Sequence, residues 1–364
     1  MVIEEPWKGD IELLDSKYEG KVALYTWKAL YTSGRENPNA TATPPMPDDI
    51  AILMYTSGST GNPKGVMLTH SNMVSALFSL VGLAEKTMNS IKDDDTYIGY
   101  LPLAHVLELL AEHTMYLLGV SIGYSSPNTL IDTSTMIIPG TRGDAPILKP
   151  TVMAAVPVIL DRIYKGINAK VAAGGPFKAA LVDFCVRYRA HWVRNGYDTP
   201  IMNKLIFGKF KQLLGGRVKV LLSGGAPLAE EAHSFIRTAL CLKLHQGYGL
   251  TETASTAIIT DPDDISVGQV GTPLQGVDVK VVSWGEGGYS VTDTVGARGE
   301  IHVGGHHVAA GYYNMPEKTA EEFYDQDGKR WFKTGDIGQV MPDGTFKIID
   351  RKKDLVKLQM GTCI

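Results

Sequence analysis

Short apolar runs alternate with helical patterns over residues 50–260 of this 364-residue chain. Apolar runs of strand length are predicted to be strands, and longer runs with a helical period to be helices. Because the two alternate, the segment predicts an α/β fold whose sheet is covered by helices on both faces. The predicted strands are Ile50–Met54, Tyr97–Tyr100, Val120–Tyr124, Thr151–Val156, Val218–Leu222 and Leu242–His245. The predicted helices are Ser71–Glu85 with Ser71 as N-cap, His105–Leu118, Pro157–Ala172 with Pro157 in its first turn, Phe177–Asn195 and Ala229–Ala239.

The pattern changes after about residue 266. Short β-type runs separated by Gly, Asp and Pro turns indicate a small β-barrel or a distorted sheet. These runs are Val277–Ser283, Gly299–Val303, Gly338–Met341 and Thr345–Ile349. Residues 32–49, rich in Pro, Asn, Thr and Asp, are typical of a loop or linker. The chain is therefore expected to divide into segments 1–49, 50–265, 266–349 and 350–364.

Composition and charge exclude several classes of protein. The chain is 44% apolar with a net charge of -4, so it is globular and has no basic field for nucleic acid. Its three cysteines form no CxxC pair, which favours a reducing compartment and argues against a zinc site or a disulfide framework. The first ten residues are acidic and lack the apolar core of a signal peptide. No run reaches the roughly 18 apolar residues of a membrane span.

The stretch YTSGSTGNPKG, from Tyr55 to Gly65, contains the residue types that bind phosphate. Glycines let the backbone approach a ligand, and hydroxyls and amides surround phosphate oxygens. Lys64 adds a positive charge for the same oxygens. The alternative is a polar surface hairpin loop, but a bare turn needs neither four Ser/Thr residues nor a lysine. Following the run Ile50–Met54, which is expected to be a buried strand, the stretch predicts a nucleotide or phosphate site.

The loop departs from the Walker-type phosphate loop. That pattern needs Gly immediately before the lysine and Ser or Thr immediately after it. Here Pro63 precedes Lys64 and Gly65 follows it. Because proline has no N–H to donate, it interrupts a nest of successive amides. The spacing therefore disfavours a Walker NTPase or a kinase.

A second polar string, HQGYGLTETAS from His245 to Ser255, also follows a predicted strand. Glu252 is a candidate ligand for Mg²⁺, which prefers carboxylate and phosphate oxygens. Tyr248 offers a flat face for a purine. The alternative is a helix N-terminus that Thr251 caps, with Glu252 at the favourable end of the dipole.

The string LLSGGAPL, Leu221 to Leu228, is a strand that ends in a glycine turn. Ligands of α/β sheets bind beyond the carboxyl ends of the strands, where Gly224, Gly225 and Ala226 would let a flat base lie against the backbone. A plain strand-to-helix turn is the alternative.

Three further features carry weaker signals. Asp336, in WFKTGDIG, is placed to accept hydrogen bonds from vicinal hydroxyls as acidic residues do on ribose, or is an ordinary β-turn aspartate. His105, at the head of an apolar helix, is a catalytic candidate or a core residue at the helix start. The charged string IIDRKKDLVKLQ, Ile348 to Gln359, has the composition of a solvated linker.

Taken in order, these motifs make the chain resemble the long-chain acyl-CoA synthetases of the adenylate-forming superfamily, over residues 22 to 359. The resemblance is closest to the animal branch that prefers unsaturated long chains such as arachidonate. The strings that carry it are IGYLPLAHVLEL, GYSSPNTL, LKPTVMAAVP, LSGGAPL, QGYGLTET, RWFKTGDIG and IIDRKKDLVKLQ.

The resemblance implies a two-step reaction: ATP and a fatty acid give acyl-adenylate and pyrophosphate, and coenzyme A then displaces AMP. It implies Mg²⁺, bound by Ser59 and Glu252, and a hinge at Lys353. Thr251 would donate to the α-phosphate, and His105 would lie near the reacting carboxylate. The phosphate-binding residues would be Thr56, Ser57, Gly58, Ser59, Thr60, Gly61 and Lys64. Adenine would contact Gly225, Ala226, Pro227, Gln246, Gly247 and Tyr248, and the ribose hydroxyls Asp336 and Arg351.

The implied fold is the large N-terminal domain of an adenylate-forming enzyme, in part, with α/β sheets and a small β-barrel subdomain. Segment 50–265 would hold the phosphate and adenine sites, 266–349 the β subdomain and 350–364 the hinge. Only 54 residues precede Tyr55, and the chain ends five residues after Gln359. We therefore expect a chain truncated at both ends, without the small C-terminal domain, and weakly active or inactive alone.

Two functions follow from this reading. The first is an AMP-forming long-chain fatty acid–CoA ligase, with the cytosolic face of the endoplasmic reticulum or another intracellular membrane as its expected location. The alternative is a non-catalytic protein that binds a nucleotide or acyl-adenylate or pairs with a full-length synthetase. No nucleic acid is expected as a partner.

Overall fold

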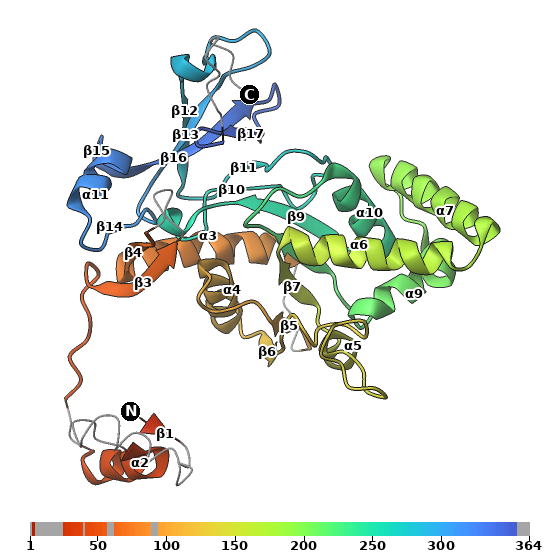
Figure 1. Cartoon of the computed structure of the whole chain (residues 1–364), viewed down its shortest axis with the longest axis horizontal. Helices are drawn as coiled ribbons and strands as arrows, with labels where there is room; N and C mark the ends of the chain where they lie inside the picture. The colour runs from red at the N-terminus through yellow and green to blue at the C-terminus, as the bar shows by residue number, and fades with distance from the viewer. Residues whose placement is uncertain (1, 4–24, 39–40, 57–61, 89–93, 355–364) are drawn as a thin grey trace. The chain divides into compact units, whose positions relative to one another are not determined.

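The computed structural model describes residues 2–3, 25–38, 41–56, 62–88 and 94–354 (Figure 1). The chain forms two compact units, Met1–Met46 and Pro47–Ile364. In the first unit, β1 (Val2–Ile3) pairs in parallel with β2 (Tyr25–Thr26), and α2 (Trp27–Glu36) follows. The hydroxyl of Thr26 accepts a hydrogen bond of 3.1 Å from the N–H of Ala29 and so caps α2.

The second unit is built on a seven-stranded sheet with the order β11-β10-β9-β8-β7-β5-β6. The strands from β9 to β6 are parallel, and β10 and β11 extend one edge in antiparallel pairing. Five predicted strands are confirmed here, with ends that differ by at most three residues. The bounds are β5 Thr96–Gly99, β6 Ser121–Tyr124, β7 Val152–Ala155, β8 Val220–Ser223, β9 Lys243–Tyr248, β10 Ile258–Ile259 and β11 Thr272–Pro273.

Helices cover both faces of this sheet, as predicted. Along β7 the side chains alternate: Met153 packs in the cluster that contains Leu160 of α6 and Ile236 of α10, whereas Val152 packs with Met115 of α4. The longer helices are α3 His70–Met88, α4 Val106–Leu117, α6 Pro157–Ala172, α7 Pro176–Arg194 and α10 Glu230–Leu240 (Figure 1). The shorter ones are α5 Asp144–Leu148, α8 Pro200–Met202, η1 Asn203–Phe207, α9 Gly208–Lys211 and η2 Gln212–Leu214.

The prediction of Ser71 as an N-cap is wrong. Helix α3 begins at His70, and Thr69 and Asn72 bond reciprocally at its start. The N–H of Thr69 donates to Asn72 Oδ1 at 3.0 Å, and the N–H of Asn72 donates to the Thr69 hydroxyl at 3.2 Å. Because the Thr69 hydroxyl accepts from the N–H of Asn72 in the first turn, no serine cap is needed.

The segment before the predicted phosphate loop belongs to a separate sheet of order β14-β4-β3, with β14 at Gly311–Tyr312. Strand β3 (Ile50–Thr56) is longer than predicted, and the expectation that it is buried is wrong. It lies at the edge of this sheet, where Ile50 is 51% exposed. The buried strand is the central β4 (Lys64–Thr69), in which Val66 is fully covered.

The β-type runs after residue 266 form an open antiparallel sheet of order β12-β13-β16-β15, with β17 also paired to β16. Register shifts in the β13–β16 and β16–β17 pairs distort it. The bounds are β12 Asp278–Val282, β13 Arg298–Gly304, β15 Phe323–Gln326, β16 Lys329–Val340 and β17 Phe346–Arg351. Helix α11, Pro316–Glu322, precedes β15. Within the described part of the chain, no helix is long and apolar enough to cross a bilayer.

Candidate functional site

A cleft of about 590 Å³ opens beyond the carboxyl ends of β8 and β9, where α/β sheets bind their ligands. Its walls come from segments far apart in the sequence. They are the β3–β4 hairpin, the turn after β8, the loop Gly249–Ser255, helix α11 and the β16 and β17 strands. Predicted site residues on these walls are Thr56, Lys64, His105, Gly225, Thr251, Glu252, Asp336, Arg351 and Lys353.

The predicted phosphate loop joins two antiparallel strands, with Thr56 paired opposite Lys64. The loop is thus a hairpin connection, and both of its ends line the cleft. The central residues Ser57, Gly58, Ser59, Thr60 and Gly61 lie outside the described residues, so their predicted roles stay predictions.

Lys64 belongs to a buried polar cluster at the floor of the cleft. Its Nζ donates to the Tyr312 hydroxyl at 2.9 Å and forms an ion pair with Glu322 at 3.0 Å. The Tyr312 hydroxyl lies 2.8 Å from Glu252 Oε1 and 2.5 Å from Glu322 Oε2. The fold therefore links the lysine of the phosphate hairpin to the predicted metal ligand through one tyrosine.

Electrostatics in this cluster favour a neutral tyrosine beside charged carboxylates. Burial, and next the Glu252 carboxylate, raise the pKa of Tyr312 well above its usual range. Burial alone would raise the pKa of Glu322, but hydrogen bonds from Tyr312 and from two lysines lower it below its ordinary value. Tyr312 therefore keeps its single proton, which lies within reach of both the Glu252 and the Glu322 carboxylate, while its oxygen accepts from Lys64.

Sequence reasoning missed Tyr312 and Glu322. They lie on β14 and α11, 248 and 258 residues after Lys64, and neither belongs to a recognisable motif. The sequence offers only a Tyr-Tyr pair followed by a carboxylate-rich helix, which by itself indicates no ligand. Only the pairing of β14 with β4 brings these side chains to the lysine.

Asp336 and Arg351 lie on one wall of the cleft, and Tyr248, predicted from a third motif, bonds to Asp336 without lining the cleft itself. Asp336 is 2% exposed, and its two carboxylate oxygens accept hydrogen bonds from Arg351 Nε at 2.6 Å and from the Tyr248 hydroxyl at 2.8 Å. Burial, followed by the charge of Asp336, raises the pKa of the Tyr248 phenol. Since each carboxylate oxygen accepts more than one hydrogen bond, Asp336 can also accept from ligand hydroxyls.

The glycine turn after β8 borders the same space. Gly225 has φ of +83°, a conformation that favours glycine, and it lines the cleft. Ala226 and Pro227 follow it and are exposed. The side chain of Gln246 is buried beside His233 of α10, outside the cleft wall, while Gly247 lines a smaller adjoining cavity.

His105 caps α4 and is exposed rather than part of the core. Its Nδ1 accepts from the N–H of Leu107 at 3.2 Å, which leaves the proton of the neutral ring on Nε2. Nε2 faces Gly225, 3.8 Å from the position that a Cβ on this glycine would take. Although the residue is exposed, the protein around the ring excludes part of its water, and this partial desolvation lowers the pKa of the imidazole. His105 therefore presents an N–H donor at the cleft wall.

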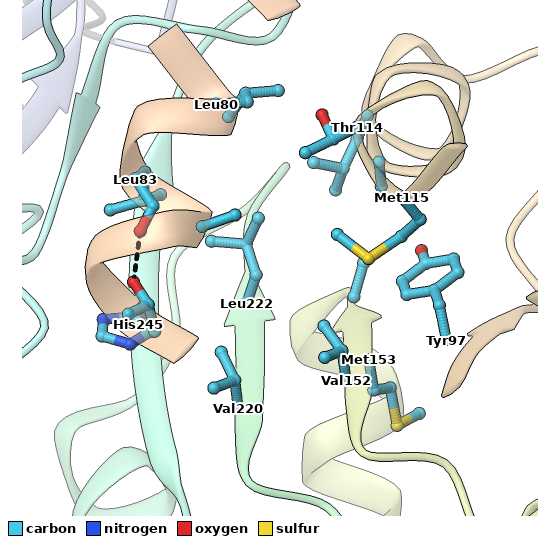
Figure 2. A pocket seen from close by; sticks show the side chains of 15 residues that line it. Leu80, Leu83, Tyr97, Thr114, Met115, Val152, Met153, Val220, Leu222 and His245 are labelled. Carbon is cyan, nitrogen blue, oxygen red and sulfur yellow. Dashed lines mark hydrogen bonds between the residues drawn. The ribbon is translucent and has the colours of Figure 1, made fainter. Parts of the chain in front are cut away.

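An apolar cavity of about 70 Å³ lies behind the cleft, between helices α3 and α4 and strands β7 and β8 (Figure 2). Leu80, Met115 and Leu222 are among the side chains that point into it. A cavity of about 30 Å³ shares Gly225 with the cleft and Leu222 with the apolar cavity. The small cavity is thus a neighbour of both the polar cleft and the apolar cavity, and residues such as Gly225 and Leu222 separate the three spaces.

Among the described residues, no group of three or more His, Cys, Asp or Glu side chains is arranged to hold a metal ion. A Mg²⁺ ion at Glu252 would therefore need ligand oxygens from elsewhere, as Mg²⁺ commonly takes from nucleotide phosphates and water. Glu252 fits this role because only its Oε1 accepts a hydrogen bond from Tyr312, and the residue borders the cleft.

The AMP-binding enzyme family matches residues 8–313 of the chain. Among curated proteins, Long chain acyl-CoA synthetase 8 of Arabidopsis thaliana is 47% identical over 324 residues, which are 87% of this chain and 44% of that protein. Fatty acyl-CoA synthetase A of Dictyostelium discoideum is 39% identical over 340 residues, 93% of this chain and 48% of that protein. The chain spans about half the length of the curated relatives that it matches.

Solved structures give the same fold. ATP-bound MatB from Rhodopseudomonas palustris aligns with a TM-score of 0.64 and 26% identity, covering 100% of this chain and 61% of that one. The N-terminal domain of FACL13 from Mycobacterium tuberculosis aligns with a TM-score of 0.60 and 23% identity, covering 94% and 72%. The predicted fold, that of the N-terminal domain of an adenylate-forming enzyme, is confirmed.

Proposed function

Because the chain belongs to the AMP-binding enzyme family, we propose that it carries the adenylating site of a long-chain fatty acid–CoA ligase. ATP and a fatty carboxylate would form acyl-adenylate and pyrophosphate, and the thiol of coenzyme A would then displace AMP. The observation that carries the proposal is one cleft in which a phosphate-type hairpin, Glu252 and the Asp336–Arg351 pair meet, with an apolar cavity behind it. The names of the relatives support the choice of long-chain acyl substrates.

The first step brings two anions together, so positive charge and positioning would dominate its catalysis. We assign Lys64 and the hairpin residues 56–61 to the β- and γ-phosphates, and Thr251 to the α-phosphate. The ion pair of Lys64 with Glu322 holds the ammonium group at the cleft floor. A phosphate that enters here would compete with Glu322 for the ammonium group. Lys64 would then pair with Glu322 in the empty site and with the phosphate in the occupied one.

The resident Mg²⁺ would neutralise phosphate charge when it is bound. Glu252 and Ser59 are the residues assigned to hold it. Tyr312 orients the Glu252 carboxylate by a hydrogen bond of 2.8 Å, which supports a fixed metal ligand at this place.

The nucleoside would lie between the Gly225–Ala226–Pro227 turn and Tyr248. The buried Asp336 would accept hydrogen bonds from the ribose hydroxyls, and Arg351 would stay bonded to it. Gln246 and Gly247 stay assigned to adenine by resemblance, although the Gln246 side chain lies against α10.

The acyl chain would extend from His105 through the small cavity into the apolar cavity. His105 would donate from Nε2 near the reacting carboxylate, and Lys353 at the cleft rim would be part of a hinge in segment 350–364. Preference for unsaturated chains is part of the proposal, as is attachment to the cytosolic face of the endoplasmic reticulum. A comparison of turnover with arachidonate, oleate and palmitate tests the preference for unsaturated chains. Fractionation of cells tests the attachment to the endoplasmic reticulum.

The test of adenylation is fatty-acid-dependent exchange of labelled pyrophosphate into ATP. It is made with this chain and with the longest protein product of its gene, and AMP and acyl-CoA are measured after coenzyme A is added. We expect exchange with oleate and Mg²⁺, and its loss in Glu252→Gln. Absence of oleate-dependent exchange from both proteins would refute the ligase proposal.

The second candidate is a non-catalytic protein that binds a nucleotide or acyl-adenylate in the same cleft or pairs with a full-length synthetase. Calorimetric titration with ATP separates the two. Binding without exchange would favour this candidate, and no binding at millimolar ATP would exclude it.

A further inference from the structure

A second cleft, of about 560 Å³, lies at the opposite ends of the parallel strands from the nucleotide cleft. Its walls include Lys219, directly before β8, and Lys243, the first residue of β9. The ends of α7 and α10 complete it, and these two helices pack against each other (Figure 1). No function proposed above uses this cleft, and the inference drawn from it is independent of the proposed function.

Basic side chains outnumber acidic ones in this second cleft, and its acids are already engaged. Asp198 pairs with Arg189 at 3.0 Å, and Asp263 pairs with Lys243 at 3.3 Å. The carboxylate of Asp264 accepts from the backbone and hydroxyl of Ser266 and from the Gln269 amide. The basic residues of the wall are Arg189, Arg194, Lys211, Arg217, Lys219, Arg237 and Lys243.

Two of these basic residues find acids just outside the wall: Arg217 pairs with Asp94 at 2.6 Å, and Lys219 with Asp95 at 2.8 Å. Arg194, Lys211 and Arg237 make no ion pair with any part of the chain that the structure describes. The cleft therefore retains positive charge after every internal pair has formed.

Arg237 gives the second, independent observation. Its NH1 nitrogen is buried and has no hydrogen-bond acceptor within the described ranges. A buried donor without an acceptor is costly, and more so when it carries charge. Burial, and next the charge of Arg194, lower the pKa of this guanidinium. The charge of Asp264 opposes this effect, but Arg194, Arg237 and Lys211 all line the same cleft, and a bound anion would supply acceptors to these three cations.

We propose that this second cleft binds a phosphate group, held between Arg194 and Arg237 with Lys211 at its side. Guanidinium groups present planar pairs of donors that match phosphate oxygens, and such hydrogen bonds are charge-assisted. The cleft would take either a soluble phosphate compound or the headgroup of a phosphate-bearing lipid, since both present the same oxygens.

The built-in reporter for this site is Trp192. Its ring lies 5.6 Å from that of Tyr197, which lines the cleft. Titration of the protein with inorganic phosphate, followed by tryptophan fluorescence and calorimetry, should show saturable binding. Arg194→Gln and Arg237→Gln should each weaken it about tenfold or more, the loss expected for a charge-assisted hydrogen bond.

Lys178→Gln is the matched control, because Lys178 is exposed on the same helix as Arg194 and lies outside the cleft wall. It should leave phosphate binding unchanged. Because Arg194 is exposed, its variant should fold even if the half-buried Arg237 variant does not. Thermal unfolding of each variant checks this point.

A second experiment distinguishes a soluble phosphate compound from a lipid headgroup as the natural ligand. Flotation with phosphatidylcholine vesicles, with and without phosphatidic acid, is measured for the natural protein and for Arg194→Gln. If vesicle binding needs both phosphatidic acid and Arg194, the site is assigned to a lipid headgroup. If the protein binds inorganic phosphate but not these vesicles, the site is assigned to a soluble phosphate compound. If neither ligand depends on Arg194 and Arg237, the proposal is wrong.

Discussion

Asp336 shows how a single side chain links distant motifs in this fold. It accepts from Arg351 of β17 and from Tyr248 of β9, so one carboxylate joins the antiparallel sheet to the parallel one. Asp336 follows Gly335, which has φ of +72°, and it lines the cleft although the residue is almost fully buried. The hydroxyls of a ribose bound here would donate to a carboxylate that Arg351 and Tyr248 already hold in position.

Asp336→Asn should weaken AMP binding about tenfold or more, because the amide loses the negative charge that Arg351 and a ribose diol both require. Calorimetric titration with AMP measures the effect. Asp327→Asn is the control: Asp327 is an exposed turn residue with φ of +53°, which asparagine also adopts. Equal AMP affinity of Asp336→Asn and the natural protein would contradict the assignment.

Glu108 of α4 is a buried carboxyl whose titration should be visible in stability. It is fully buried, and the Tyr97 hydroxyl donates to its Oε2 at 2.9 Å, while its Oε1 has no partner in the described part of the chain. Burial raises the pKa of Glu108 from 4.5 to about 7. The folded protein thus holds this proton more tightly than the unfolded chain does.

The contribution of Glu108 to the free energy of unfolding should therefore be highest below pH 4.5, fall by roughly 3 kcal/mol between pH 4.5 and about 7, and then level off. Glu108→Gln should remove most of that fall, and Glu85→Gln, at an exposed position of α3, should not. Urea unfolding from pH 4.5 to 8 makes the comparison. Parallel curves for Glu108→Gln and the natural protein would rule out the assignment.

The predicted site residues come from contiguous strings, because glycines, hydroxyls and charges gather wherever the backbone itself contacts a ligand. Tyr312, Glu322 and Glu108 were not predicted, since each acts through a partner that only tertiary packing supplies. Gln246 shows the converse: its string is predictive, yet its own side chain lies against α10.

Among the elements, the ends of helix α6 were predicted correctly, whereas the burial of strand β3 was not. Helix α6 has the predicted ends, because Pro157 fixes its start. Strand β3 was predicted at the right place, but its burial was not, because an apolar run does not reveal whether a strand is central or at an edge. The order β14-β4-β3 depends on a pairing with Gly311–Tyr312, far along the chain.

The junction of β10 and β11 depends on Gly271. This residue has φ of +92°, and a Cβ there would lie 1.9 Å from the carbonyl oxygen of Ile259. Gly276 has φ of +78° but open space around it. Gly271→Ala should therefore lose several kcal/mol of unfolding free energy, against about 1 kcal/mol for Gly276→Ala, where only backbone strain acts. Denaturant unfolding measures both, and similar losses would contradict the close packing of this edge.

The proposed path of the acyl chain runs along the inward face of α4, which should therefore limit the length of chain that fits. Ala111 lines the apolar cavity of about 70 Å³, so a phenylalanine there would fill the space. Ala111→Phe should reduce adenylation of oleate relative to octanoate about tenfold, because the longer chain needs that volume. Ala111→Ser keeps the size and is the control. An unchanged ratio would place the acyl chain elsewhere.

At the scale of the second unit, the parallel strands separate two clefts of different chemistry. The cleft proposed to bind the nucleotide lies beyond their carboxyl ends, and the second cleft, called basic here for its seven Arg and Lys residues, lies at their amino ends. His245 lines both the basic cleft and the apolar cavity, and burial lowers the pKa of its imidazole to about 4. His245 is therefore a neutral side chain between the basic cleft and the apolar cavity, and it is the residue to test for a connection between the two sides of the sheet.

Ligand binding should stabilise the protein independently at the two clefts. A ligand at 100 times its dissociation constant adds about 2.7 kcal/mol to the free energy of unfolding. With AMP and inorganic phosphate together, we expect the two increments to add within about 0.5 kcal/mol, since the clefts share no described lining residue. Asp336→Asn should remove only the AMP increment and Arg194→Gln only the phosphate increment.

Urea unfolding with each ligand, with both and with neither completes this cycle. A departure from additivity above about 1 kcal/mol would show that the clefts are coupled, and reciprocity then requires phosphate to change AMP affinity by the same factor. Repeating the cycle in His245→Gln would decide whether the coupling passes through this residue. Loss of both increments in either single variant would instead show that the two ligands occupy one site.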